Sequence, residues 1–150
     1  METSFWLGLE ALYQLTSNGG YTRMRVEMYT NDGAWYSAEY DHFSLKGESQ
    51  HYRLNISGYA GDAGDHLWPN NGQTFSAYDQ GVRNSLARTM EGGWWYSGYD
   101  FACLNGVYDT GESTGFYWNS NYQPPPPETL SLVGVTPGRL RMSRIMIARP

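Results

Sequence analysis

The chain has 150 residues, enough for one domain with a hydrophobic core, and it is rich in glycine (18), tyrosine (13) and tryptophan (6). Only 17% of its residues are charged and its formal net charge is −5, so neither a nucleic acid nor an anionic membrane is expected as a partner. No run of about 20 apolar residues predicts a membrane span, and no signal peptide is visible. Cys103 is the one cysteine, which excludes an intrachain disulfide and any metal site built from several thiolates.

A short amphipathic helix is expected near the N-terminus. Ser4 is predicted to cap it, because a serine oxygen can accept a hydrogen bond from a backbone N–H of the first turn. Gly19 and Gly20 are predicted to end it. The apolar residues that recur at helical spacing on one face are Phe5, Leu9, Leu12 and Leu15.

Alternation of apolar and polar residues predicts an antiparallel sheet after this helix. Residues 21–30 alternate, and the turn sequence Asn31-Asp32-Gly33 leads into a return strand over residues 35–40. A third alternating segment over residues 52–56 closes at Gly58. The first strand has an apolar side and a charged side, formed respectively by Met24, Val26 and Met28 and by Arg23, Arg25 and Glu27.

The second half of the sequence loses this periodicity. Residues 58–118 are punctuated by glycine, asparagine, aspartate and aromatic residues, which indicates a folded region built from loops, where function often resides. The four prolines at 124–127 predict an extended, exposed excursion, with a polyproline-type binding motif as the alternative. Residues 142–147 alternate again and predict a last strand that returns to the sheet.

Two single residues have competing interpretations. Asn55 begins the sequon Asn55-Ile56-Ser57 and is a possible glycosylation site, although three-residue matches also arise by chance. Cys103 is expected to be a buried small apolar residue, with pairing to another molecule as the alternative.

Four motifs occur in a specific order: SFWLGLEALYQLT, RMRVEMYTNDGAWYSAEYDHFSL, YRLNISGYAGDAGD and GGWWYSGYDFACLNGVY. With them the sequence resembles the fibrinogen-related domain of fibrinogen, ficolins, tachylectins, angiopoietins and tenascins, nearest in motif to the ficolin and tachylectin-like members. The resemblance runs from Phe5 to about Trp118 and resumes weakly at the C-terminus. It implies an α+β fold, fibrinogen C-terminal-like, in which a twisted antiparallel sheet with flanking short helices adjoins a loop-rich binding subdomain. It also implies a secreted, extracellular protein.

The resemblance gives a domain plan for residues 1–150 as a single, truncated fibrinogen-related domain. The small disulfide-bearing subdomain that usually precedes the FWLG motif has no counterpart in this sequence. The sheet subdomain is expected at about 1–60 and the loop-rich binding subdomain at about 61–123. A proline-rich insertion is expected at 124–138 and the returning C-terminal strand at 139–150.

Departures from the family pattern affect both stability and metal binding. The family disulfide falls on Leu86 and Tyr99, so packing or partners must replace that staple. Trp94 and Trp95 are expected in the core, as they are in the family, with a sugar platform as the alternative. In the calcium loop Asp79 stands at the first ligand position, but Gly81 replaces the second carboxylate. Because Ca²⁺ needs six to eight oxygen ligands, no tight calcium site and no other cofactor are expected.

The acetyl-sugar pocket of ficolin-like members is also altered. Its aromatic wall falls on Met90, its histidine on Asp100 and its downstream tyrosine-alanine pair near Glu112-Ser113, so none of these residues is retained. A diverged loop surface could still bind sugar by stacking and hydrogen bonding, with plain packing as the alternative for its aromatic residues. The candidate ligand-binding residues are Met90, Tyr99, Asp100, Phe101, Tyr108 and Glu112.

Two functions remain open at this point. The first is an extracellular, lectin-like recognition module that binds a glycan or glycoprotein through a diverged pocket. The alternative is a structural or adhesive module that joins protein partners, or forms a homo-oligomer, without binding sugar. An enzyme is not expected, because neither the histidines nor the carboxylates of the loop region show a catalytic or metal-binding spacing; these residues are His42, His51, His66, Glu91, Asp100, Asp109 and Glu112.

Overall fold

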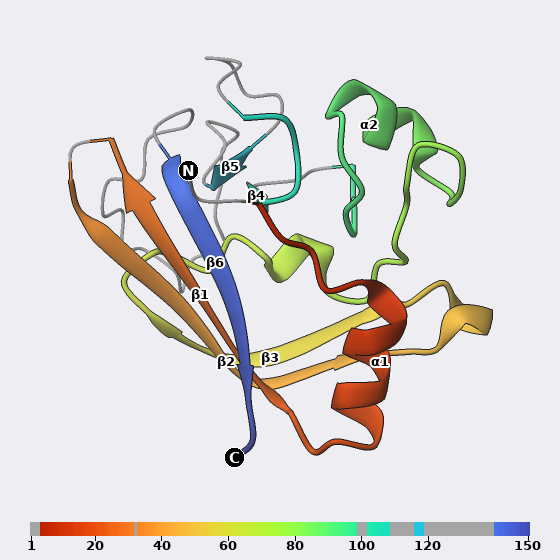
Figure 1. The fold of residues 1–150 in the computed structure, drawn as a ribbon, viewed down its shortest axis with the longest axis horizontal. Helices are drawn as coiled ribbons and strands as arrows, with labels where there is room; N and C mark the ends of the chain where they lie inside the picture. Colours follow the sequence, from red (N-terminus) through yellow and green to blue (C-terminus); the bar gives the residue numbers. More distant parts are fainter. Residues whose placement is uncertain (1–3, 32, 99–101, 109–115, 119–139) are drawn as a thin grey trace.

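The structure is a computed structural model that describes residues 4–31, 33–98, 102–108, 116–118 and 140–150 (Figure 1). A twisted sheet forms one part of the molecule, and short helices and loops form the other (Figure 1). The sheet contains β1 (Arg23–Thr30), β2 (Trp35–Leu45), β3 (Leu54–Gly61) and β6 (Leu140–Ala148). The other elements are α1 (Leu9–Ser17), η1 (Glu48–Gln50), η2 (Trp68–Asn70), α2 (Asn84–Thr89), β4 (Ala102–Cys103) and β5 (Tyr117–Trp118). This mixed α+β architecture confirms the predicted fold class.

The four-stranded sheet has the order β3-β2-β1-β6, and every neighbouring pair is antiparallel. Val26 lies at its centre, opposite Ala38 of β2 on one side and Ile145 of β6 on the other. The C-terminal strand therefore returns to the sheet, as the alternation of residues 142–147 predicts.

The alternation of β1 separates the two faces of the sheet. Met24, Val26, Met28 and Thr30 are buried, whereas Arg23 lies on the opposite, outer face. Successive side chains of a strand point to opposite faces, so the outer residues of all four strands share one surface. Helix α1 packs against β2.

The predicted helix start is wrong. The helix begins at Leu9 and its N-cap is Gly8, which provides no side-chain hydrogen bond. Gly8 has φ of 94°, a left-handed conformation that a residue with a Cβ rarely adopts, and it turns the backbone before the helix. Phe5, which the spacing places on the apolar helix face, precedes the helix and is 83% exposed.

Two strands are longer than the sequence predicts. β2 continues past Tyr40 to Leu45, because Phe43 and Leu45 remain buried and pair with β3. β3 continues past Gly58, the residue expected to close it, and reaches Gly61 opposite Ala38.

The loop-built half has an aromatic core. Trp94 and Trp95 are 1% and 4% exposed, which confirms their predicted core position. An isolated bridge pairs Trp94 with Ser76, and the two short strands pair Ala102 with Trp118. Cys103 is fully buried, in agreement with the interpretation of a small apolar residue.

The two glycines before these tryptophans lie so close to neighbouring loops that there is no room for a side chain. A Cβ on Gly92 would collide with the backbone of Asn105 and Gly106, and a Cβ on Gly93 would lie 2.7 Å from two ring carbons of Phe75. Only glycine lets the loops close this tightly over the tryptophans.

Among the described residues, no helix has the length and apolarity that a membrane span needs.

Candidate binding surfaces

The predicted ligand-binding residues are only partly within the described structure. Tyr99, Asp100, Phe101 and Glu112 lie outside the described residues, as do the prolines at 124–127.

Met90 and Tyr108 are described, and their segments meet, because the backbone N–H of Val107, the neighbour of Tyr108, donates to the carbonyl of Met90 (3.4 Å). Met90 is partly buried against the core, whereas Tyr108 is 56% exposed, with its ring centroid 6.0 Å from that of Phe116. Of this pair, only Tyr108 offers an open aromatic surface.

The loop that carries Asp79 is tightly folded. The N–H of Ala77 donates to the carbonyl of Gln80 (2.8 Å), and the N–H of Arg83 donates to the hydroxyl of Ser76 (3.1 Å). Within the described ranges, no group of three or more His, Cys, Asp or Glu side chains could hold a metal ion. The expected absence of a tight calcium site therefore stays a prediction.

The same loop displays two apolar side chains. Tyr78 is 70% exposed and Val82 is 82% exposed. Arg88 of α2 fixes this part of the loop, because its Nε donates to the carbonyl of Tyr78 (2.9 Å) and its guanidinium lies 4.9 Å from the centroid of the Tyr78 ring. An exposed aromatic ring is thus held in a defined position.

Asn55, the possible glycosylation site, is an exposed residue of β3. Its Nδ2 lies 3.1 Å from Nε2 of His42 and 3.4 Å from the hydroxyl of Ser44 on the neighbouring strand. Exposure is compatible with the sequon, and glycosylation stays a prediction.

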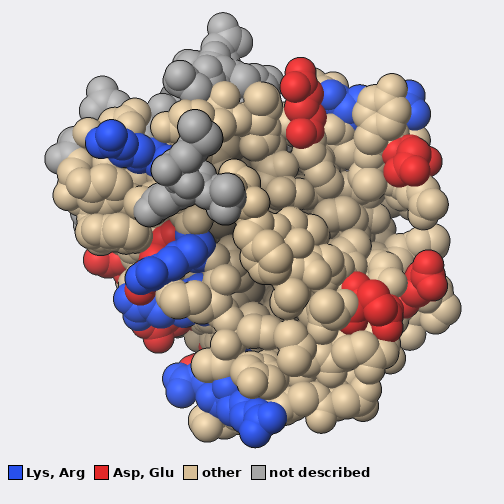
Figure 2. Space-filling view, in the orientation of Figure 1, with Lys and Arg blue, Asp and Glu red and all other residues tan. Residues whose placement is uncertain are grey.

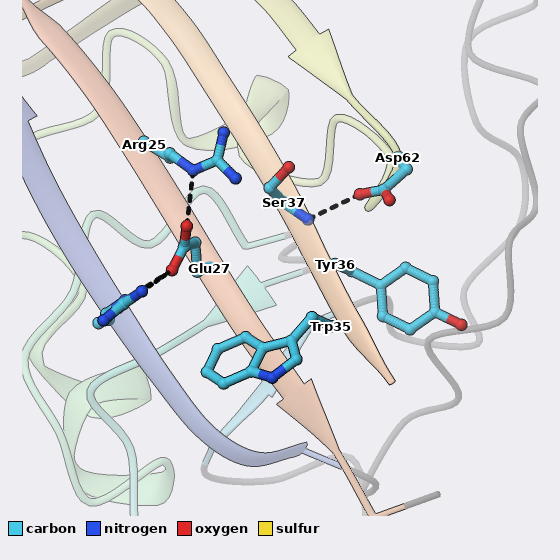
Figure 3. A pocket seen from close by; sticks show the side chains of 7 residues that line it. Arg25, Glu27, Trp35, Tyr36, Ser37 and Asp62 are labelled. Atoms are coloured by element: carbon cyan, nitrogen blue, oxygen red, sulfur yellow. Dashed lines mark hydrogen bonds and ion pairs between the residues drawn. The ribbon is translucent and has the colours of Figure 1, made fainter. Parts of the chain in front are cut away.

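A shallow pocket of about 310 Å³ lies on the outer face of the sheet (Figure 3). Sequence reasoning did not identify it. Its lining residues come from β1, β2, β6 and the turn after β3, and they are Arg25, Glu27, Trp35, Tyr36, Ser37, Asp62 and Arg144. Trp35 is 49% exposed and forms an aromatic wall of the pocket.

The strand register assembles an apolar row beside this pocket. Trp35 of β2 lies opposite Tyr29 of β1, which in turn lies opposite Met142 of β6. The ring centroids of Trp35 and Tyr29 are 4.9 Å apart, and the guanidinium of Arg144 lies 5.7 Å from the Trp35 ring. These contacts hold the indole while leaving about half of it exposed.

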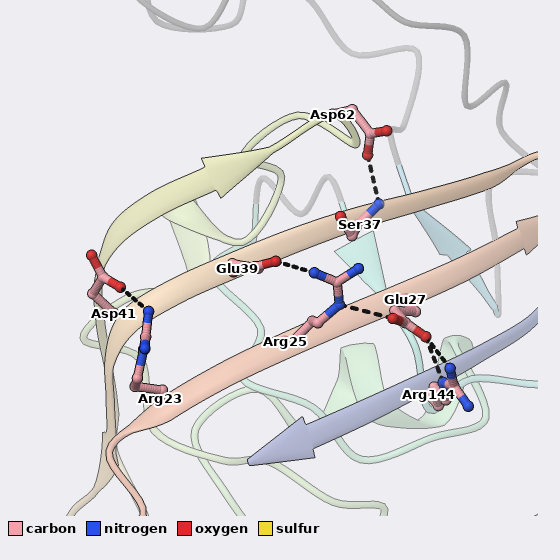
Figure 4. A network of polar contacts seen from close by, with 8 residues as sticks. All are labelled: Arg23, Arg25, Glu27, Ser37, Glu39, Asp41, Asp62 and Arg144. Carbon is pink, nitrogen blue, oxygen red and sulfur yellow. Dashed lines mark hydrogen bonds and ion pairs between the residues drawn. The ribbon is translucent and has the colours of Figure 1, made fainter. Parts of the chain in front are cut away.

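A ladder of ion pairs crosses three strands and includes three residues of the pocket lining, Arg25, Glu27 and Arg144 (Figure 4). Nε of Arg144 donates to Glu27 (2.6 Å), Nε of Arg25 donates to the other oxygen of Glu27 (2.8 Å), and Arg25 also pairs with Glu39. The hydrogen bond from Arg25 lowers the pKa of Glu27, and the hydrogen bond to Glu27 raises the pKa of Arg25. Both groups are therefore charged at neutral pH. Figure 2 shows basic and acidic side chains intermixed over these strands.

Asp62 completes the pocket from the turn after β3. One of its carboxylate oxygens accepts a hydrogen bond from the backbone N–H of Ser37 (2.7 Å), as Figure 3 shows.

The sequence contains a signal for this surface, because the alternation that buries Met24, Val26 and Met28 turns Arg25 and Glu27 outward. The alternation does not predict the strand register that brings β6 and Asp62 to the same pocket.

Comparison with known proteins gives a consistent family. The family model for the C-terminal globular domain of the fibrinogen beta and gamma chains matches residues 1–122. Human angiopoietin-related protein 6 is 42% identical over 123 residues, covering 79% of this chain and 25% of that protein. Human tenascin-R is 36% identical over 122 residues, covering 79% of this chain and 9% of that protein. The sequence thus spans at most about a quarter of the length of these relatives.

A solved structure agrees with the sequence matches. The fibrinogen-like globe domain of human ANGPTL6 has a TM-score of 0.70 at 36% identity, covering 97% of this chain and 63% of that structure. The relatives are angiopoietin-related proteins and tenascins rather than ficolin-like lectins, which corrects the expectation that ficolins and tachylectins are nearest.

Proposed function

Because the chain belongs to the family of fibrinogen C-terminal globular domains, we propose that it acts as an extracellular, non-enzymatic recognition module that binds a protein partner. Its relatives, angiopoietin-related proteins and tenascins, support a place outside the cell and a role in recognition rather than catalysis. This is the protein-assembly alternative of the sequence analysis rather than its lectin hypothesis.

The observation that carries the proposal is the apolar pair on the Asp79 loop. Tyr78 and Val82 expose 70% and 82% of their surface on a loop whose backbone is fixed by internal hydrogen bonds. Tyrosine is among the residues that contribute most binding energy at protein interfaces. Solvated side chains of this kind gain most when a partner surface removes them from water.

Arg88 prepares Tyr78 for such a contact. It binds the carbonyl and covers the ring of Tyr78, so less side-chain freedom is lost when a partner docks. A glycine at position 81, with φ of 100° and packed against Ser76, keeps the loop tight.

The test uses the domain, tetramerised on streptavidin, and extracellular matrix laid down by cultured fibroblasts. We expect Tyr78→Ala to weaken binding at least tenfold, because a central aromatic anchor typically contributes about 2 kcal/mol or more. Tyr21→Ala is the matched control, since Arg149 covers Tyr21 at 5.0 Å in the same way and Tyr21 lies before β1, away from the Asp79 loop. We expect this control to bind normally.

Treating the matrix distinguishes a protein ligand from a sugar ligand. Trypsin should abolish binding, and a mixture of endoglycosidases should leave it unchanged. Loss of binding after the endoglycosidases, with Tyr78→Ala still binding, would overturn the protein-recognition proposal.

Glycan binding by the loop-built half is the second candidate. The exposed ring of Tyr108, backed by Phe116, favours it because sugar rings stack on such surfaces. Its remaining predicted residues, Tyr99, Asp100, Phe101 and Glu112, lie outside the described residues. Tyr108→Ala, compared with the native domain on a glycan array, tests this candidate separately.

A further inference from the structure

We propose that the outer-face pocket beside Trp35 binds a neutral hexopyranose, such as the terminal residue of an uncharged glycan. This site is separate from the Asp79 loop, so the inference goes beyond the proposed protein recognition and does not depend on it. It also differs from the predicted loop pocket, because its lining residues come from the sheet and from the turn after β3.

The aromatic wall suits the apolar face of a sugar ring. Trp35, which lines the pocket, is 49% exposed, and Met142, at the far end of the same cross-strand row, is 37% exposed. Tyr29 and Arg144 contact the indole and fix its orientation. A flat ring held in place can stack on the C–H groups of a pyranose with little loss of side-chain freedom.

The polar lining suits hydroxyl groups in particular. A hydroxyl both donates and accepts, so it is best matched by a site that offers acceptors and donors together. Glu27 and Asp62 supply carboxylate oxygens, and Arg25 and Arg144 supply guanidinium N–H groups. Ser37 adds a hydroxyl between them (Figure 3).

The charge balance selects against ionic ligands. Two guanidinium groups, Arg25 and Arg144, and two carboxylates, Glu27 and Asp62, line the pocket. The two carboxylates would repel an anionic ligand while the two guanidinium groups attract it, and the reverse holds for a cationic ligand. Neither kind of ligand therefore gains a net electrostatic attraction. A neutral ligand rich in hydroxyls can use all four groups.

The site is also preformed and of limited size. Glu27 is held between two arginines and its side chain is only 16% exposed, while Asp62 is held by the N–H of Ser37. The volume of about 310 Å³ lies at the lower end of the range for small-molecule sites. One sugar ring therefore fits better than an extended oligosaccharide.

The test is saturation-transfer NMR and titration with the methyl glycosides of glucose, galactose and mannose, with sialyllactose as an anionic probe. We expect at least one neutral glycoside to bind in the millimolar range, and Trp35→Ala to weaken that binding at least tenfold. Trp68→Ala is the matched control, because Trp68 is exposed to a similar extent (44%) but lies in η2, outside the pocket lining. It should bind like the native domain.

Asp62→Asn provides a second variant that preserves the fold, because an amide oxygen can still accept the N–H of Ser37. Removing this carboxylate should weaken neutral-sugar binding several-fold. The inference is overturned if no neutral glycoside binds, if sialyllactose binds best, or if Trp35→Ala binds as the native domain does.

Discussion

The adjacent tryptophans of the loop-built core allow a test of how the pairing of one buried indole N–H affects the stability of the folded protein. Trp94 and Trp95 are both buried, with ring centroids 5.3 Å apart. Nε1 of Trp95 donates to the carbonyl of Tyr52 (2.8 Å), whereas Nε1 of Trp94 is buried with no acceptor within reach among the described residues. The substitutions Trp94→Phe and Trp95→Phe remove the same atoms, and only the second breaks a hydrogen bond.

The two variants should therefore differ in stability. Both lose packing, but Trp95→Phe also gives up a hydrogen bond worth about 1 kcal/mol, while Trp94→Phe removes an unpaired buried donor that costs about 1–3 kcal/mol. We expect Trp94→Phe to be the more stable variant by roughly 2–4 kcal/mol, which corresponds to about 4–16 °C in Tm for a domain of this size. Urea and thermal unfolding followed by near-ultraviolet circular dichroism measure both quantities.

The expected difference is refuted by equal unfolding midpoints, or by a lower midpoint for Trp94→Phe. Either result would mean that packing geometry, rather than pairing of the indole N–H, decides the cost at this point in the core.

Three other outcomes are expected. Burial lowers the pKa of His66 to about 4, so below pH 6.5 the unfolded chain takes up a proton at this histidine that the folded protein does not. The free energy of unfolding should therefore be highest above pH 6.5 and should fall by about 3 kcal/mol as the pH drops toward 4. His66→Gln should flatten that part of the curve of stability against pH. Gly92→Ala should lower the free energy of unfolding by about 1–3 kcal/mol, because the new Cβ meets the backbone of Asn105, and a urea midpoint equal to the native one would contradict this. Millimolar calcium should leave Tm unchanged, since a ligand stabilises only a native site that it occupies, and a rise of several degrees would reveal oxygen partners for Asp79.

The sheet was predictable because its physical basis is local. Alternation over residues 21–30 follows from one buried face, and it survives in the structure as the buried side chains of Met24, Val26 and Met28. The helix start was not predictable in this way. It depends on the positive φ of Gly8, and a serine upstream gives a plausible cap in sequence that the backbone does not use.

The outer-face pocket illustrates a different limit. The outward positions of Arg25 and Glu27 follow from the pattern, but the apolar row requires residue 142 to pair with residue 29, and that register comes from a strand more than a hundred residues away. Asp62 reaches the pocket only because β3 continues past Gly58. The residue types of this pocket could be read from the sequence, but the pairing of strands far apart in the chain could not.

The arginines link the two proposed surfaces to the composition of the protein. In an acidic protein, Arg88 covers Tyr78 and Arg144 covers Trp35, and both guanidinium groups also make hydrogen bonds to neighbouring residues. Positive charge at these surfaces is thus used to hold exposed aromatic rings rather than to build a field for a polyanion. Such surfaces recognise their ligands by shape, stacking and hydrogen bonding, so binding at either should depend only weakly on salt concentration. A steep loss of affinity with added salt at the Trp35 pocket or the Tyr78 loop would show instead that unpaired charge drives recognition there.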